Sequence, residues 1–329
     1  MNKNLNEPAA LSPPWSLMEA RDINHGYRRR RRGMWARAGL KNVLSHVSLA
    51  VGQGLTLGLV GESGSGKSTL ARLMLGMERP LSGKVLYKGN PMPRPFSGPW
   101  KKLRSKMQMV FQDPYAALDK RMTILEQAAE PLLIHGLADK KTALELARES
   151  LAKVSFPAHC LERKPGSLSG GQLQRAVIAR AVILKPEFLI CDEPVASLDV
   201  SIQAQVLILL SQLKADLNMS MVFVSHDLNV VSHISDHLAV LHRGRLVESG
   251  PVKQIFDRPA HPYTELLLSC APGSKKTFVQ ASFSRDEAQA SGCAFYRRCP
   301  RRQSECRDMA PPLSAVAPAR QAACFFPLV

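Results

Sequence analysis

The sequence lacks the features that mark membrane-spanning, exported or disulfide-stabilised chains. No apolar run reaches the roughly 18 residues needed to cross a bilayer, and the first 15 residues have no basic start followed by an apolar stretch. Seven cysteines in 329 residues are too few and too unevenly placed for a disulfide scaffold. We therefore expect a chain that is neither exported nor membrane-spanning and that works in a reducing compartment.

Acidic residues are also scarce relative to basic ones. Lys and Arg number 44 against 27 Asp and Glu, which gives a formal net charge of +17 at pH 7. This excess favours an anionic partner, a class that includes nucleotides, nucleic acids and anionic membrane surfaces. Apolar residues make up 45% of the chain and charged residues 22%, so a packed core is expected and wholesale disorder is excluded.

Short apolar strands alternate with helical patterns through the middle of the chain. The run LTLGLV at 55–60 ends at a glycine-rich turn, after which STLARLMLG has helical periodicity. Similar strands are expected at 188–191 and 221–224, and VSIQAQVLILLSQLKADL is one of the helical patterns between strands. The alternation predicts an α/β fold with a parallel sheet. A turn at Arg243 and Gly244 predicts a hairpin, where we expect the sheet to end.

Composition divides the chain further. Residues 1–16 contain three prolines and are predicted to form a loose leader, whereas 17–252 form the main domain, with a mostly helical insert at about 114–185. Residues 253–329 read as an extension whose tail is rich in Cys, Arg and Pro. Residues 28–32 are all arginine, for which we expect a solvated loop, with contact to lipid headgroups or a partner as the alternative.

The glycine-rich turn carries the pattern G-x-x-x-x-G-K-[ST] between a strand and a helix, which is the context that such a loop requires. Its glycines let successive backbone N–H groups point at phosphate oxygens near the positive end of a helix dipole. Lys67 is then expected to reach the β- and γ-phosphates and Ser68 to offer a hydroxyl to Mg²⁺. The loop consists of Gly61, Glu62, Ser63, Gly64, Ser65, Gly66, Lys67 and Ser68.

Two adjacent carboxylates end a later strand. The run FLIC is followed by Asp192 and Glu193, at the end of the strand where ligands of parallel sheets gather. Asp192 is expected to hold the Mg²⁺ shell and Glu193 to act as the general base that polarises the attacking water. Together with the phosphate loop, this pair predicts a nucleoside triphosphatase.

A third motif before a helix makes the chain resemble the ATP-binding-cassette (ABC) superfamily. The resemblance runs from about residue 17 to 262. The segments VFQDPYAALDKRMT and SLDVSIQAQ are similar in sequence to members of the branch of peptide and nickel importers. It implies a P-loop NTPase (RecA-like) core with an antiparallel β subdomain and an inserted helical subdomain. It also places Thr69 in the ATP site beside Ser68. The motif is the signature sequence Leu168, Ser169, Gly170, Gly171 and Gln172.

Other family positions have counterparts in the same order along the chain. The resemblance implies that Tyr27 stacks on adenine, although the arginine run and RGMWARAGLK lengthen the loop after it. It implies that Gln112 joins the Mg²⁺ site to the surface that docks a membrane subunit, and that His226 contacts the γ-phosphate. On residue type alone, His226 would more often be a packing histidine, and a partly buried core aromatic is the alternative for Tyr27. The segment after the carboxylates corresponds to Ser197, Leu198 and Asp199.

The same resemblance implies an assembly. In the family two cassettes dimerise head to tail, so Ser169 and Gly171 serve the ATP that is held by the partner's phosphate loop. The implied partners are a second and similar ATPase, more in keeping with a heterodimer than a homodimer, two integral membrane permeases and an extracytoplasmic substrate-binding protein. The location implied is the cytoplasmic face of the plasma (inner) membrane, with no nucleic acid as partner.

Four cysteines crowd into the end of the chain. Cys293, Cys299, Cys306 and Cys324 lack the paired C-x-x-C spacing of a zinc ribbon, but four thiols in a cytosolic chain suggest a thiolate site for zinc or an iron–sulfur cluster. Spacing alone leaves metal binding open. ATPase subunits of the peptide-importer branch often end in a similar segment, which makes a [4Fe–4S] cluster the leading hypothesis and zinc the alternative.

The sequence therefore predicts the ATPase subunit of an importer that takes up di- and oligopeptides. A nickel or metal-chelate importer of the same branch is the alternative. A soluble ABC protein of translation or DNA repair is a more distant one, because those proteins usually carry two cassettes or long coiled-coil arms. A non-catalytic cassette would have lost the catalytic set, yet Lys67, Asp192, Glu193 and His226 are all present.

Overall fold

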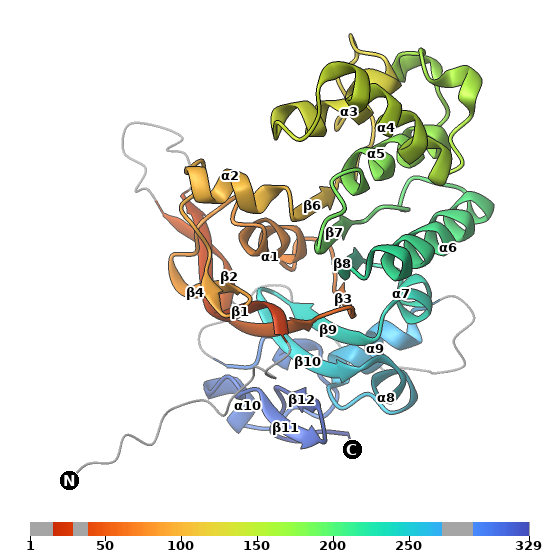
Figure 1. Ribbon diagram of the computed structural model, residues 1–329. Helices are drawn as coiled ribbons and strands as arrows, with labels where there is room; N and C mark the ends of the chain where they lie inside the picture. The colour runs from red at the N-terminus through yellow and green to blue at the C-terminus, as the bar shows by residue number, and fades with distance from the viewer. Residues whose placement is uncertain (1–15, 29–38, 272–291, 329) are drawn as a thin grey trace, which may run out of the picture.

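A computed structural model describes residues 16–28, 39–271 and 292–328 (Figure 1). Most of the predicted leader, most of the arginine run and residues 272–291 lie outside these ranges. Ser16, the last residue of the predicted leader, already begins the first strand, and Arg28 ends it. Within the described part of the chain, none of the helices combines the length and apolar character that a bilayer crossing requires.

An eight-stranded sheet forms the centre of the molecule, in the order β11-β12-β10-β9-β3-β8-β7-β6. The pairs from β6 to β9 are parallel and those from β9 to β11 are antiparallel. Its strands are β3 (Thr56–Val60), β6 (Met107–Val110), β7 (Phe188–Asp192), β8 (Ser220–Ser225), β9 (His237–His242), β10 (Arg245–Pro251), β11 (Ser314–Ala317) and β12 (Arg320–Ala322). The predicted strands at 55–60, 188–191 and 221–224 are thereby confirmed, as is the hairpin at Arg243.

The prediction that the sheet ends at this hairpin was wrong. β12 pairs with β10, so the end of the chain adds two strands to the central sheet. The buried Arg320–Glu248 ion pair anchors this addition, with Nη2 and Oε1 2.7 Å apart. Glu248 also accepts the backbone N–H groups of Ala260 and His261. An unpaired buried carboxylate is costly, so Glu248 and Arg320 require each other. The two residues are 72 positions apart, and no local sequence pattern predicts such a pair.

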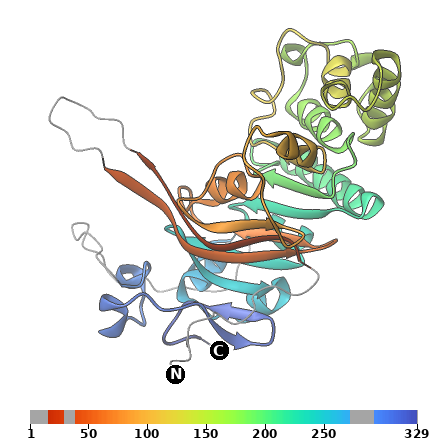
Figure 2. The same cartoon turned by 60° about the vertical axis from the view of Figure 1, so that its left-hand side comes forward.

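A smaller antiparallel sheet, in the order β2-β1-β4-β5, faces one side of the central sheet. Helix α1 (Lys67–Met74) lies between the two sheets and shares one apolar cluster with both. The two strands β1 and β2 form a long ribbon, drawn in red and orange in Figure 2. The strands of this sheet are β1 (Ser16–Arg28), β2 (Leu40–Gly52), β4 (Ser82–Tyr87) and β5 (Asn90–Pro91).

Alternation along the strands sets the two faces of the central sheet. In β7, Phe188 and Ile190 join the cluster with α1, whereas Leu189 and Cys191 join a second cluster with helices on the other face. The helices of the second cluster include α5, α6 and α7, which explains why β7 reads as a continuous apolar run.

A helical unit projects from the carboxyl end of the sheet, in yellow and green in Figures 1 and 2. It holds α3 (Ile124–Ile134), α4 (Lys140–Lys153) and α5 (Gly170–Val182), in agreement with the mostly helical stretch expected at 114–185. Capping boxes at Thr123 and Ser169 fix where α3 and α5 begin. The other helices are α2 (Gly98–Arg104), α6 (Val200–Leu217), α7 (Leu228–Ile234), α8 (Val252–Asp257), α9 (Pro262–Ser269) and α10 (Glu305–Asp308).

Candidate functional site: a nucleotide cavity at the end of the central sheet

The phosphate loop connects β3 to α1, and two of its glycines are required by close contacts. A Cβ atom on Gly61 would lie 2.0 Å from the carbonyl oxygen of Leu241, and one on Gly66 would lie 2.7 Å from Cδ2 of Leu44. Their φ angles are +152° and +106°, which L side chains rarely adopt. The chain beside β9 and β2 therefore leaves room for this loop only where the sequence has glycine.

Lys67 is the first residue of α1 and folds back over the loop. Its Nζ donates to the carbonyl oxygens of Gly61 at 2.7 Å and Glu62 at 3.1 Å. The side chain is buried, and burial lowers its pKa, with the carboxylates of Glu193, Asp192 and Glu62 acting in the opposite direction. The N-cap residue Gly66 has no side chain to cap the helix, so the first N–H groups of α1 remain suited to an anion.

Ser68 and Asp192 bring the loop and β7 together. The Oγ of Ser68 donates to Oδ1 of Asp192 over 3.1 Å. Burial raises the pKa of Asp192, and this effect outweighs the lowering by the hydrogen bond from Ser68. A hydroxyl beside a carboxylate is a donor set of hard oxygens that fits Mg²⁺.

Glu193 lies at the centre of a second group. Its Oε2 is 3.3 Å from Nε2 of Gln112 and 3.2 Å from Nδ1 of His226. Glu193 has a positive φ of 46°, a conformation uncommon outside glycine and found often at functional positions. The structure thus brings together Gln112, Glu193 and His226 from three separate loops.

Lys67, Ser68 and the group around Glu193 line one cavity of about 750 Å³, whereas Asp192 lies behind Ser68 and is not among the lining residues. Tyr27 lies on its wall, with its hydroxyl donating to Glu78 at 2.8 Å and accepting from Arg72 at 3.2 Å. These bonds and an edge-to-face contact with His25 fix the orientation of the ring, which is 40% exposed. The cavity is lined by Tyr27, Lys41, Asn42, Val43, Ser63, Gly64, Gly66, Lys67, Ser68, Thr69, Gln112, Glu193, His226 and Arg243.

Sequence reasoning missed four of these lining residues, the segment 41–43 and Arg243. Residues 41–43 lie near the start of β2, and Arg243 lies in the hairpin turn between β9 and β10. Neither belongs to a phosphate-binding motif, and only the fold places them beside the loop. The basic side chains of Lys41 and Arg243 add positive charge to a cavity that already contains Lys67.

The signature residues are not among those that line this cavity in the described part of the chain. Ser169 caps the N-terminus of α5, where its Oγ accepts the N–H of Gln172. A Cβ on Gly171 would lie 2.9 Å from Ile202, and one on Gly170 3.5 Å from Leu198. The signature loop is therefore packed beside the segment Ser197 to Asp199, and Asp199 caps α6.

The four tail cysteines line one small cavity of about 20 Å³, together with aromatic residues such as Phe295 and Phe325. Burial raises the pKa of Cys293 to about 11 and also raises that of Cys299 and Cys324. Four cysteine side chains gathered at one place, none of them in a disulfide, suit a thiolate site. As the described residues are arranged, however, no three His, Cys, Asp or Glu side chains form a group that could hold a metal ion.

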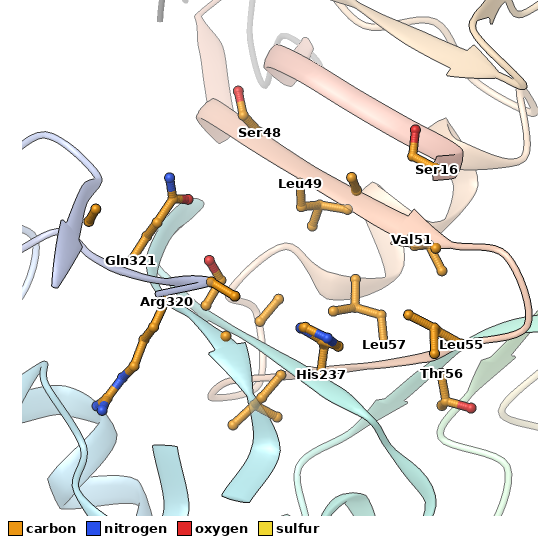
Figure 3. Close-up of a pocket in the computed structure, with 18 of the residues that line it drawn as sticks. Ser16, Ser48, Leu49, Val51, Leu55, Thr56, Leu57, His237, Arg320 and Gln321 are labelled. Atoms are coloured by element: carbon orange, nitrogen blue, oxygen red, sulfur yellow. The ribbon is translucent and has the colours of Figure 1, made fainter. Parts of the chain in front are cut away.

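A separate cavity of about 540 Å³ lies between the two sheets and the hairpin that β11 and β12 form (Figure 3). Leu49 and Val51 of β2 face Leu57 of β3 across it, with His237 and Arg320 on its other walls. None of the predicted nucleotide-site residues lines it.

Comparison with known proteins agrees with the geometry. Residues 44–196 match the family described as ABC transporter, and residues 247–306 match the C-terminal region of oligopeptide/dipeptide transporters. A protein of Brucella abortus (strain 2308) named as a peptide import ATP-binding protein is 44% identical over 283 residues, or 84% of each chain. One of Brucella ovis with the same kind of name is 40% identical over 294 residues, covering 88% of this chain and 93% of that protein.

Solved structures share the fold. The ATP-binding cassette MJ0796, as a dimer in a post-hydrolysis state bound to ADP and Pi, superposes with a TM-score of 0.63 at 26% identity, covering 71% of this chain and 98% of that one. The cbiO1 protein of Clostridium perfringens, at 24% identity and a TM-score of 0.62, covers 74% of this chain and 91% of its own. The chain therefore belongs to the ABC transporter family, as an ATPase that carries the oligopeptide/dipeptide transporter C-terminal region.

Proposed function

We propose that this ATPase powers the uptake of di- and oligopeptides by an ABC importer. The observation that carries the proposal is the match of residues 247–306 to the C-terminal region of oligopeptide/dipeptide transporters. The names of the relatives that are 40–44% identical support the same substrate class. The nickel or metal-chelate importer is the alternative, and uptake assays distinguish it.

The site residues take the following roles in the proposed cycle. The N–H groups of the phosphate loop and Lys67 bind the β- and γ-phosphates of ATP, and Tyr27 stacks on adenine. Ser68 and Asp192 hold Mg²⁺, with Gln112 nearby, and the ion when bound neutralises phosphate charge. Glu193 accepts a proton from the attacking water, while His226 contacts the γ-phosphate. The distances of 3.2 and 3.3 Å from Glu193 to His226 and Gln112 support this grouping.

The signature loop completes the site of a second chain. Ser169 and Gly171 lie outside the chain's own cavity, at the N-terminus of α5, where N–H groups suit a phosphate. In the proposed head-to-tail dimer they contact ATP on the partner ATPase, so ATP joins the two chains and hydrolysis releases them. The pair works at the cytoplasmic face of the membrane with two permeases and an extracytoplasmic substrate-binding protein. Residues 17–252 act as the ATP-binding domain and 253–329 as its extension.

Uptake of labelled peptides tests the function directly. Cells carrying wild-type or Glu193→Gln protein are compared for uptake of di- and oligopeptides and of nickel, with and without a chelator. Loss of peptide uptake alone supports the proposal, and loss of metal uptake alone favours the alternative. If neither uptake changes, the importer proposal is wrong. Glu145→Gln, which alters an exposed carboxylate on α4, is the matched control.

We also propose that Cys293, Cys299, Cys306 and Cys324 hold a metal group, with a [4Fe–4S] cluster favoured over zinc. Their gathering around one cavity supports this, and the thiols would have to move to bind it. Protein purified without oxygen should contain iron and show a broad visible absorbance that a four-cysteine variant loses. Zinc without absorbance favours the alternative, and absence of both metals overturns the proposal. Cys270→Ser, at an exposed thiol outside this cavity, is the control.

A further inference from the structure

The C-terminal tail reaches the phosphate loop through an ion pair. Nη1 of Arg298 lies 2.6 Å from Oε1 of Glu62, the second residue of the loop, although 236 residues separate them. Arg298 ends a short 3₁₀ turn and directly precedes Cys299. The side chains are 25% and 41% exposed, so the pair is partly shielded from water.

A second contact fixes the same loop residue. The backbone N–H of Glu62 donates to the hydroxyl of Tyr263 over 3.0 Å. Tyr263 is fully buried on α9, with its ring centroid 5.4 Å from that of Phe295, and the Arg298 guanidinium lies 5.7 Å from the Phe295 ring. Both groups that hold Glu62 therefore come from the C-terminal region and share one aromatic cluster.

The ion pair also offsets an unfavourable charge. Glu62 places a carboxylate in a loop that binds phosphates, and this carboxylate is close enough to act on Lys67. The ring of His242 lies 4.0 Å from Glu62 and is neutral at physiological pH, because burial lowers its pKa to about 3, helped by Arg243 and Arg298. Arg298 supplies the positive charge in direct contact with Glu62.

We propose that Arg298 is a positioning residue of the ATP site, which acts through Glu62 to hold the phosphate loop ready for the nucleotide. A loop held in its binding shape loses less conformational freedom when ATP binds. The paired carboxylate also repels the triphosphate less than a free one does. The tail is thus a structural part of the ATP site, whatever substrate is transported and whatever the cysteines hold.

Nucleotide binding and hydrolysis by the full-length chain test this proposal. We expect Arg298→Ala to raise the KM and the dissociation constant for ATP about two- to fivefold, the range of a partly exposed ion pair, while kcat changes less than about twofold. Arg298→Lys keeps the charge but not the planar guanidinium, so its dissociation constant for ATP should lie between those of wild type and Arg298→Ala. Arg307→Ala, which removes an exposed guanidinium from the same tail, should match wild type.

A double-mutant cycle separates positioning from simple loss of the fold. Glu62→Gln breaks the ion pair from the loop side and leaves the tail's side chains intact. If Arg298 acts through Glu62, Arg298→Ala should weaken ATP binding less than about twofold in the Glu62→Gln background. An equal loss in both backgrounds, or unchanged ATP affinity in Arg298→Ala, overturns the proposal.

Discussion

The hydroxyl of Ser68 donates a hydrogen bond to the carboxylate of Asp192 across 3.1 Å. The first residue belongs to the helix after the phosphate loop and the second ends β7, 124 residues later. The bond joins the two motifs that the sequence shows separately. It also brings together two oxygen donors that would suit Mg²⁺, and the ion would supply positive charge beside a bound triphosphate.

Asp192→Asn should remove most of the effect of Mg²⁺ on ATP binding. The amide keeps the shape of the side chain but loses the negative charge that a divalent cation requires. We expect the ratio of ATP affinities with Mg²⁺ and with EDTA to fall toward unity in the variant, while Asp216→Asn, at an exposed position on α6, keeps the wild-type ratio. Calorimetric titration of both variants checks this. An unchanged ratio in Asp192→Asn would contradict the assigned role.

Glu193→Gln should preserve ATP binding and slow hydrolysis. The amide retains contacts to Gln112 and His226 but cannot accept a proton from the attacking water. General-base catalysis typically contributes about a hundredfold to ten-thousandfold, so turnover should drop within that range. Phosphate release under saturating ATP measures the loss, and equilibrium binding shows that affinity is kept. Normal steady-state hydrolysis would rule out Glu193 as the base.

Two glycines of the phosphate loop form a matched pair for a stability test. Gly61 and Gly64 both have positive φ angles, +152° and +78°, but only at Gly61 would a Cβ meet backbone, the oxygen of Leu241 at 2.0 Å. Gly64→Ala should cost about 1 kcal/mol from backbone strain alone. Gly61→Ala should cost about 3 kcal/mol or more, because β9 must also move. Urea unfolding measures both, and equal losses would show that the contact at Leu241 relaxes freely.

Local sequence patterns were sufficient to predict the central strands, and they also singled out the phosphate loop and the carboxylate pair that the structure places side by side. Successive apolar residues of β7 and β8 face α1 and the smaller sheet on one side and α5, α6 and α7 on the other, so both strands are visible as continuous apolar runs. The helix predicted from VSIQAQVLILLSQLKADL corresponds to α6 (Val200–Leu217), with Asp199 as its cap. The phosphate loop and the carboxylate pair were recognisable because the chemistry that they are suited to requires particular residue types at a fixed spacing.

Contacts between distant segments were not predictable in the same way. β12, which pairs with β10, is a short segment of small and polar residues. Glu248, the buried partner of Arg320, cannot be told from an exposed charged residue of a hairpin in the sequence alone. The Arg298–Glu62 pair is one of many arginine and glutamate combinations that composition allows. Such contacts depend on the packed fold, so from the sequence the tail was predicted to be a separate extension.

The stability of the junction between the two sheets should depend on the charge of Glu187. Its carboxylate, just before β7, accepts from the Tyr87 hydroxyl at 2.6 Å and pairs with Lys88 and Lys106. Burial alone would raise the pKa of Glu187, but these partners outweigh it and lower the pKa from 4.5 to about 2. A lowered folded pKa contributes stability that is complete above about pH 4.5 and is lost as pH falls through about 2.

Glu187→Gln should therefore destabilise the protein at neutral pH and less so in acid. Because the side chain is one-third exposed, solvent screening limits the expected loss to about 1 kcal/mol at pH 6. At pH 3 the difference from wild type should narrow, since the unfolded wild-type chain is then largely protonated at this position. Urea unfolding at the two pH values measures it, with Glu145→Gln as the exposed control. A difference that stays constant or grows between pH 6 and pH 3 would contradict the ionic origin of this stability.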